Sequence, residues 1–199
     1  MNRNLESFRG YVHPHWSGRD MTYLELGVFE GMSLTWMFQR VLTSEGSRAV
    51  GVDPWMETTK LSGDAMDQVM IRARKNLSRY CLQGTLGTAG IKRCQLIRGN
   101  SAEVLRRMVV GKGYAGFGRD SVDVSMIDGN HNALAVLDDA RLVLQLIRIG
   151  GWLLFDDVEN DHPKRDHVKE GVEMFLRETG DRVKLIWKHR YMEAYERVR

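Results

Sequence analysis

Short apolar runs alternate along this chain with longer stretches in which apolar residues recur every three or four positions. Thr22–Gly27 is apolar at alternate positions and ends in glycine, which is typical of a β-strand. Met32–Ser44 carries its apolar residues at helical spacing, which predicts an α-helix. The same pattern predicts four further strands, Ala49–Asp53, Gln95–Gly99, Val122–Asp128 and Trp152–Phe155. It also predicts three further helices, Asp64–Tyr80, Ser101–Val110 (capped by Ser101) and Ala133–Ile149.

Five strands interleaved with four helices favour right-handed crossovers and a parallel sheet with helices on both faces. After a further predicted helix at Lys164–Thr179, the pattern changes. Val183–Lys188 and Met192–Val198 read as strands, and their separation is too short for a crossover, so they should form an antiparallel hairpin. The expected fold is therefore α/β: a doubly wound, mostly parallel, seven-stranded sheet that ends in an antiparallel hairpin.

Length and charge limit the classes of function. The 199 residues, 43% of them hydrophobic, suit one domain, with a core at 21–199 and an N-terminal extension at 1–20. The chain has 29 basic and 26 acidic residues, so we expect neither a nucleic-acid nor a membrane partner. We expect a cytoplasmic protein with Cys81 and Cys94 as reduced thiols, because the sequence has no membrane-spanning run and no apolar leader at its start. A homodimer is compatible with the sequence.

Polar residues and glycines follow all five predicted parallel strands. In open parallel sheets, ligands bind at the carboxyl ends of the strands, near the point where the strand order reverses. The residues at these ends are Gly27–Gly31, Asp53, Asn100–Ser101, Asp128–His131 and Asp156–Asp157. Strand-to-helix turns attract Gly, Asp and Asn in any case, which could account for any one of these groups but accounts poorly for all five.

Two of these ends favour a nucleoside ligand. In Glu25–Gly31 (ELGVFEG), Gly27 would let the backbone approach a ligand while the amides of the next helix point toward it. Asp53 ends the second strand, where a carboxylate can accept hydrogen bonds from both ribose hydroxyls; the alternative is a turn-forming residue before Pro54. A GxGxxG pattern at Gly111–Gly116 follows a helix and precedes a strand, so it reads as a surface loop.

Five motifs in order resemble the class I S-adenosylmethionine-dependent methyltransferases: ELGVFEG, GVDPW, RGNSAEVL, SMIDGNH and RIGGWLLFDD. The likeness covers Thr22–Asp157 and extends to the terminal hairpin. IDGNH together with FDD is most similar to the small-molecule O-methyltransferases of the macrolide-sugar and catechol groups. Catechol-type enzymes carry Asp-Asn where this chain has Asp156-Asp157, and this departure favours the sugar-modifying group.

The resemblance implies a role for each motif. S-adenosylmethionine would be the cofactor, with Asp128 beside it. Its methionine end would be held by four residues, Glu25, Gly27, Gly31 and Ser33. Its ribose would be held by Asp53, and its adenine would lie against Asn100 and Ser101. A divalent cation, Mg²⁺ or a similar ion, would be held by Asp128, Asp156 and Asp157.

The paired acids at the end of the fifth strand need a physical explanation. Two carboxylates about 4 Å apart repel by roughly 4 kcal/mol at a surface-like effective dielectric, and a hard cation would offset this repulsion. Alternatively, Asp157 caps a turn and Asp156 pairs with Arg or Lys. His131 could serve as general base, with Asp128 as the other candidate, or could be a loop histidine that contacts the cofactor.

The sequence therefore predicts methyl transfer to a hydroxyl of a small molecule, such as a sugar or a phenolic natural product. DGNH stands where nucleic-acid amine methyltransferases of this fold carry Asn- or Asp-Pro-Pro-aromatic. Two alternatives stay open: a nicotinamide-dependent oxidoreductase, which lacks a correctly placed GxGxxG, and a non-catalytic module that binds the cofactor. Tyr11–Trp16 and Trp55–Gly63 show no regular pattern and are the expected lid segments that select the substrate.

Overall fold

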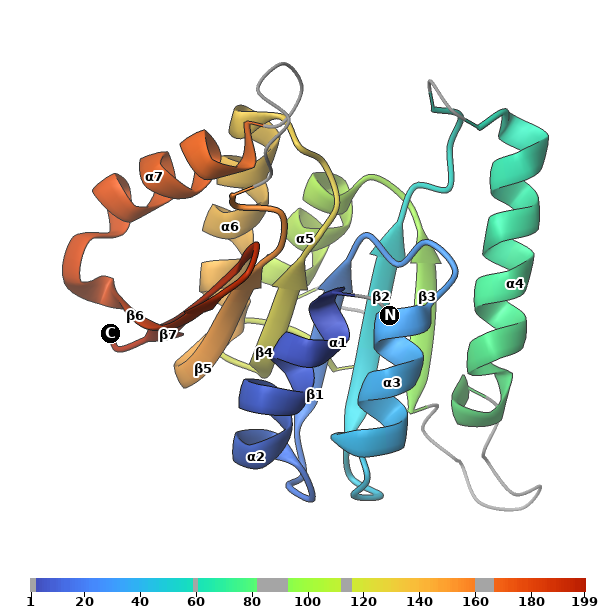
Figure 1. Ribbon diagram of the computed structural model, residues 1–199, viewed down its shortest axis with the longest axis horizontal. Coiled ribbons are helices and arrows are strands. Elements are labelled where there is room, and N and C mark those ends of the chain that lie inside the picture. The colour runs from blue at the N-terminus through green and yellow to red at the C-terminus, as the bar shows by residue number, and fades with distance from the viewer. Residues whose placement is uncertain (1–2, 59–60, 82–92, 112–115, 160–166) are drawn as a thin grey trace.

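The computed structural model describes residues 3–58, 61–81, 93–111, 116–159 and 167–199. Its seven strands form one sheet in the order β3-β2-β1-β4-β5-β7-β6 (Figure 1). The five parallel strands are β1 (Thr22–Leu26), β2 (Arg48–Asp53), β3 (Cys94–Arg98), β4 (Val122–Ile127) and β5 (Ile147–Phe155). The two antiparallel strands are β6 (Val183–His189) and β7 (Met192–Arg197). The predicted fold class is confirmed.

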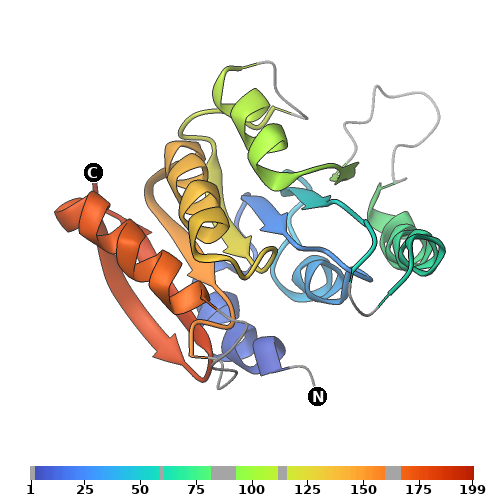
Figure 2. The same cartoon turned by 90° about the horizontal axis from the view of Figure 1, so that it is seen from above.

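Helices cover both faces of the sheet (Figure 2). One face carries α5 (Ser101–Val109), α6 (Ala133–Leu146) and α7 (Val168–Thr179), followed by the short helix η2 (Gly180–Arg182). The other face carries α1 (Arg3–Ser7), the π-helix η1 (Phe8–Val12), α2 (His13–Trp16), α3 (Met32–Arg40) and α4 (Gly63–Cys81). A separate apolar cluster fills each interface, as expected for strands that are buried on both sides.

Several predicted boundaries differ from the structure by a few residues, and the difference is clearest where α6 meets β5. α6 ends at Leu146 and not at Ile149, because β5 already begins at Ile147 and pairs there with Val122. The strand register shifts before Trp152, and Gly150 takes a left-handed φ of +78° within this irregular stretch. The apolar pattern runs on across this junction, so it gave no sign that the helix had ended.

The N-terminal segment is helical, whereas the sequence suggested an irregular stretch at Tyr11–Trp16. Phe8, Val12 and Trp16 are buried in the apolar cluster that also contains residues of β5, β6 and β7. Their spacing of four residues places them on one side of a helix, which explains why the segment folds onto the sheet.

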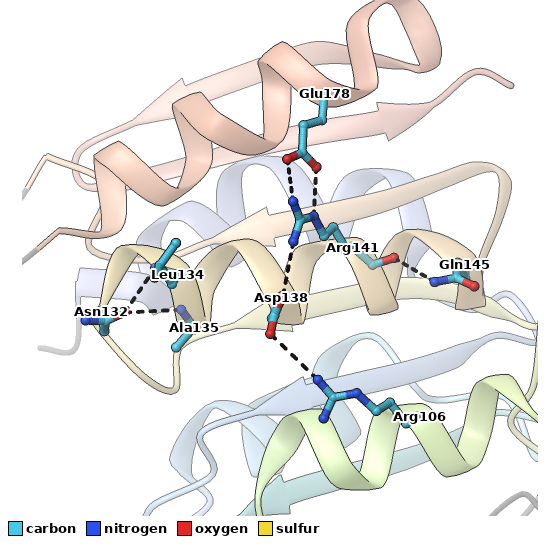
Figure 3. Close-up of polar contacts among 8 residues, drawn as sticks. All are labelled: Arg106, Asn132, Leu134, Ala135, Asp138, Arg141, Gln145 and Glu178. Atoms are coloured by element: carbon cyan, nitrogen blue, oxygen red, sulfur yellow. Dashed lines mark hydrogen bonds and ion pairs between the residues drawn. The ribbon is translucent and has the colours of Figure 1, made fainter.

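On the opposite face, ion pairs link three helices. Arg141 of α6 pairs with Glu178 of α7 and with Asp138, and Asp138 also pairs with Arg106 of α5 (Figure 3). All four side chains are about half exposed, so these pairs add little to stability. We regard this surface as structural.

Some predictions lie partly outside the described residues: the centre of the Gly111–Gly116 loop, residues 59–60 of the second lid segment and the start of the helix predicted from Lys164. Among the described helices, none combines the length and the apolar character needed to cross a bilayer.

Candidate active site

The predicted site residues gather at the carboxyl edge of the sheet, where main-chain hydrogen bonds join neighbouring strand ends. Gly27 N donates to Val52 O at 2.9 Å, and Asp128 N donates to Leu26 O at 2.9 Å. Asp156 N donates to Ile127 O at 3.2 Å. The ends of β1, β2, β4 and β5 are thereby fixed relative to one another, which places their polar side chains at one edge.

Gly27 is required by the packing of two strand ends. Its φ is +86°, and a Cβ built on it would lie 1.8 Å from the main-chain oxygen of Asp128. The sequence argument assigned this glycine to the approach of a ligand, but the immediate obstacle to a side chain is the protein backbone itself. Gly31, with φ +75°, precedes the first turn of α3 and faces Leu77 of α4.

Glu25 is fully buried and acts together with Ser33. Its carboxylate accepts hydrogen bonds from the hydroxyl of Tyr23 at 2.8 Å and from the hydroxyl of Ser33 at 2.7 Å. Burial raises the pKa of Glu25 to about 7, although both hydrogen bonds act in the opposite direction. Ser33 also lines the cavity described below, so Glu25 can influence a ligand there through this hydroxyl.

Asp53 joins two loops by hydrogen bonds to Phe29 and Trp55, and we call this arrangement the Asp53 clasp. Its Oδ2 accepts a hydrogen bond from Phe29 N at 2.9 Å, and its Oδ1 accepts one from Trp55 N at 2.7 Å. The indole N–H of Trp55 in turn donates to Phe29 O at 2.9 Å. Phe29 and Trp55 have φ values of +50° and +39°, a region that non-glycine residues rarely adopt. Any ribose contact by Asp53 would therefore use the lone pairs that these bonds leave.

The sequence analysis missed Arg98, which secures the same turn from β3. Its guanidinium donates to Trp55 O at 2.9 Å and to Pro54 O at 3.3 Å, and it pairs with Asp67 of α4 at 2.7 Å. The only signal in the sequence was an arginine near the end of a predicted strand. The contacts of Arg98 depend on a strand pairing that cannot be read from the sequence.

Asn100 and Ser101 lie at the end of β3 but differ from the expected arrangement. The helix cap is Asn100, whose side chain accepts a hydrogen bond from Glu103 N at 3.2 Å; Ser101 is the first helical residue. The Ser101 hydroxyl donates to Asp139 of α6 at 2.9 Å. Burial raises the pKa of Asp139 to about 6. The predicted contact of this pair with adenine stays a prediction.

Asp128, His131 and Asp157 form a cluster in which one ligand-type atom of each residue lies within 4.8 Å of the others. His131 Nε2 is 3.7 Å from Asp157 Oδ2. Burial raises the pKa of Asp128 well above its usual range, and the charges of Asp156 and Asp157 raise it further. Several carboxyl groups therefore stand close together at the carboxyl ends of β4 and β5, and the protonated form of Asp128 is favoured there.

His131 joins Asp128 and Asp157 in this cluster, and the charge of Asp156 also acts on Asp128, so the predicted role of Asp156 as a cation ligand stays a prediction. Asp156 is buried and continues the line of β5, whereas Asp157 has φ +56° and turns the chain out of the strand. The loop that carries His131 is held by His167 N, which donates to His131 O at 3.0 Å.

A cavity of ≈ 640 Å³ opens beside these groups. Its lining includes Gly27, Ser33 and Asp128 from the predicted set, together with Trp36 of α3 and Leu5 of α1. The sequence analysis missed the last two residues. The helical spacing of Leu5, Phe8, Val12 and Trp16 was the signal that could have revealed the N-terminal wall.

Comparisons with known proteins agree with this geometry. Residues 24–158, more than half of the chain, match a family model described as a methyltransferase domain. The chain belongs to this methyltransferase family. A curated relative, the uncharacterized protein R132 of Acanthamoeba polyphaga mimivirus, is 26% identical over 141 residues, which are 71% of this chain. The methyltransferase spans about half (53%) of that protein's length.

Solved structures share the fold at low sequence identity. The calicheamicin-biosynthesis enzyme CalS11, a TDP-rhamnose 3′-O-methyltransferase, matches with a TM-score of 0.63 and 17% identity, over 98% of this chain and 78% of its own. The 1,6-didemethyltoxoflavin N1-methyltransferase of Burkholderia thailandensis, with bound S-adenosylhomocysteine, has a TM-score of 0.60 and 14% identity, over 98% and 78%. A putative rRNA methylase of Clostridium thermocellum has a TM-score of 0.66 and 14% identity, over 100% and 98%.

The family and the fold identify the chain as a class I S-adenosylmethionine-dependent methyltransferase, as the motifs predicted. The nicotinamide-dependent alternative is therefore set aside. The acceptors named for the three solved structures are a sugar oxygen, a ring nitrogen and ribosomal RNA, so the fold alone does not select an acceptor.

Proposed function

We propose that this methyltransferase transfers the methyl group of S-adenosylmethionine to a hydroxyl of a small molecule, with a divalent cation at the end of the cavity. The observation that carries the proposal is the cluster of Asp128, His131 and Asp157, joined to the cavity by Asp128. Hydroxyls are poor nucleophiles at neutral pH, and this cluster offers both a base and a cation site to activate one.

The donor set fits a divalent cation. Two carboxylates and an imidazole converge within 4.8 Å, and the buried charge of Asp156 adds to the negative potential. Asp128 and Asp157 would hold the ion, which could be Mg²⁺ because carboxylate oxygens are its preferred protein ligands. When bound, it would orient the acceptor hydroxyl and lower the pKa of that hydroxyl.

The chain's own residues then have separate tasks. The Gly27 turn and Ser33, backed by Glu25, would hold the methionine end of the cofactor, and the Asp53 clasp would border its ribose. His131 would take the acceptor proton at Nε2, and Asp157, 3.7 Å away, would stabilise the resulting imidazolium. The deprotonated oxygen would form a bond to the methyl carbon while the carbon–sulfur bond breaks, and the electron pair of that bond would stay on sulfur.

The proposed acceptor rests on the charge balance of the chain and on one protein of similar structure. A near-balanced total of 29 basic and 26 acidic residues, with acids concentrated at the cluster, favours a small neutral acceptor over a phosphate backbone. The sugar O-methyltransferase CalS11 has the same fold and methylates a sugar hydroxyl. We therefore propose a sugar or phenolic hydroxyl.

The test is the formation of S-adenosylhomocysteine with a panel of sugars and phenols, before and after treatment with a chelator and again after Mg²⁺ is added. We expect product to form, to fall with the chelator and to return with the ion. Transfer that is confined to RNA would contradict the proposed acceptor. Cofactor binding without transfer to any acceptor tested would favour the non-catalytic alternative.

A further inference from the structure

We infer that His189, at the tip of the β6–β7 hairpin, is a positioning residue that holds the N-terminal wall of the cavity in place for the cofactor. The inference rests on the proposal that S-adenosylmethionine occupies this cavity. It requires neither the cation nor any particular acceptor.

The central contact joins two parts of the chain that are 182 residues apart in sequence. Ser7 is completely buried, and its hydroxyl lies 2.9 Å from Nδ1 of His189. Leu5, which lines the cavity, stands only two residues before Ser7 on the same helix α1. Because a buried hydroxyl is costly to leave without a partner, this bond fixes where α1 ends and therefore where Leu5 lies.

Further contacts clamp the same segment between the hairpin and α3. The ring of Tyr11 stacks on Trp187 of β6 at a centroid distance of 4.8 Å. Phe8 packs against Trp36 of α3 at 5.7 Å, and Trp36 also lines the cavity. The wall is thus held by the hairpin on one side and by the cofactor-facing helix on the other.

The chain changes its helical geometry at this point. The π-helix η1 begins at Phe8, directly after the residue that bonds His189. π-helical turns are rare and are found frequently at functional sites. The wider turn lets Ser7 and Tyr11 both meet the hairpin, since the Tyr11 ring also lies 5.6 Å from the ring of His189.

The hairpin tip is itself anchored next to the acidic cluster. Val158 N, directly after Asp157, donates a hydrogen bond of 2.8 Å to Tyr191 O. Arg190, between His189 and Tyr191, pairs with Glu6 of α1. The hairpin tip is therefore bonded both to the loop after Asp157 and to α1. It holds the N-terminal wall of the cavity at a fixed position relative to the cluster of Asp128, His131 and Asp157.

The experiment is calorimetric titration of the full chain with S-adenosylhomocysteine, together with steady-state kinetics on a responding acceptor. His189→Ala should weaken binding roughly five- to tenfold, which is the effect of one buried hydrogen bond. His189→Asn, which keeps a polar group near the position of Nδ1, should recover most of the loss. KM for S-adenosylmethionine should rise while kcat stays within about twofold of the parent, because the cluster itself is unchanged.

Arg199→Ala is the matched control, because Arg199 forms an exposed pair with Asp181 outside the active-site edge. It should bind S-adenosylhomocysteine like the parent. If His189→Ala fails to fold, Ser7→Ala removes the same bond from the other side and should show the same loss. Parental affinity in a folded His189→Ala or Ser7→Ala variant would overturn the inference. A parent protein that does not bind S-adenosylhomocysteine would overturn the cofactor assignment as well.

Discussion

The hydroxyl of Ser33 donates a 2.7 Å hydrogen bond to the fully buried carboxyl group of Glu25, whose pKa is raised to about 7. A carboxyl group with a raised pKa stays protonated in the folded state while the unfolded chain already ionises. Its contribution to stability is therefore complete below pH 4.5, the ordinary value, and is lost as the pH rises through about 7.

The first prediction follows from this loss of stability with rising pH. The free energy of unfolding of the parent should fall between pH 4.5 and pH 7, and Glu25→Gln should remove about 3 kcal/mol of that fall. Urea unfolding of both proteins at several pH values measures the difference. Asp139, with its pKa raised to about 6, adds a fall of the same sign in both proteins and so cancels in the comparison. Equal slopes would show that Glu25 ionises normally.

The second prediction concerns Gly27. Gly27→Ala should lower the free energy of unfolding by about 2–4 kcal/mol, because its Cβ would collide with the Asp128 carbonyl and its φ is left-handed. Gly18→Ala is the matched control: it has the same φ class at +77°, but nothing lies within 4 Å of the added carbon. It should cost only about 1–2 kcal/mol. Equal losses in the two variants would show that the contact with the Asp128 carbonyl adds nothing to the cost of the left-handed φ.

A third prediction concerns the Asp53 clasp. Asp53→Ala should lower the free energy of unfolding by about 1–3 kcal/mol even without cofactor, because the amides of Phe29 and Trp55 lose their acceptor. Asp53→Asn keeps the shape of the side chain and one acceptor oxygen, so it should cost less. Chemical denaturation measures both variants, and calorimetry with S-adenosylhomocysteine then shows whether Asp53→Ala also weakens binding by about 1–3 kcal/mol. Unchanged stability in Asp53→Ala would mean that the clasp is dispensable.

The fourth prediction separates a cation site from a structural acid pair. In metal-free buffer, Asp128→Asn should raise the melting temperature, because burial and the neighbouring charges of Asp156 and Asp157 already disfavour ionisation of this carboxyl group. The same variant should lose methyl transfer, as should Asp157→Asn. Fluorimetric melting in chelator and in Mg²⁺ provides the readout: the parent should gain stability with the ion and Asp157→Asn should not. A parent that melts at the same temperature in both buffers would contradict the cation site.

The fold, and the edge of the sheet where the candidate residues meet, could be predicted because both depend on local pattern. Alternating strands and helices imply a parallel sheet, and a parallel sheet brings Gly27, Asp53 and Asp128 to one edge. The contact between His131 and Asp157 depends instead on the turns that follow β4 and β5. Asp157 has φ +56° and its carboxylate lies 3.7 Å from His131 Nε2, and the residue names alone do not encode this arrangement.

The end of α6 and the N-terminal helices were mispredicted for a related reason. Apolar spacing continues from Leu146 into β5, so only the pairing of Ile147 with Val122 reveals the boundary. Around Trp16, histidine, proline and glycine obscured a four-residue apolar period that becomes decisive once the sheet offers a surface to cover.

The packing of the first helices on the last hairpin also bears on synthesis. Phe8, Val12 and Trp16 are synthesised well before some of their partners, because their cluster includes Trp187, Met192 and Ala194, which are made some 180 residues after Phe8. The nascent chain must carry three large apolar side chains without these partners until the residues of the hairpin have been made. Chaperone demand in the cell should therefore track the emergence of the final hairpin, and a ribosome stalled before it should hold a chain whose first segment is still open to proteases and to aggregation.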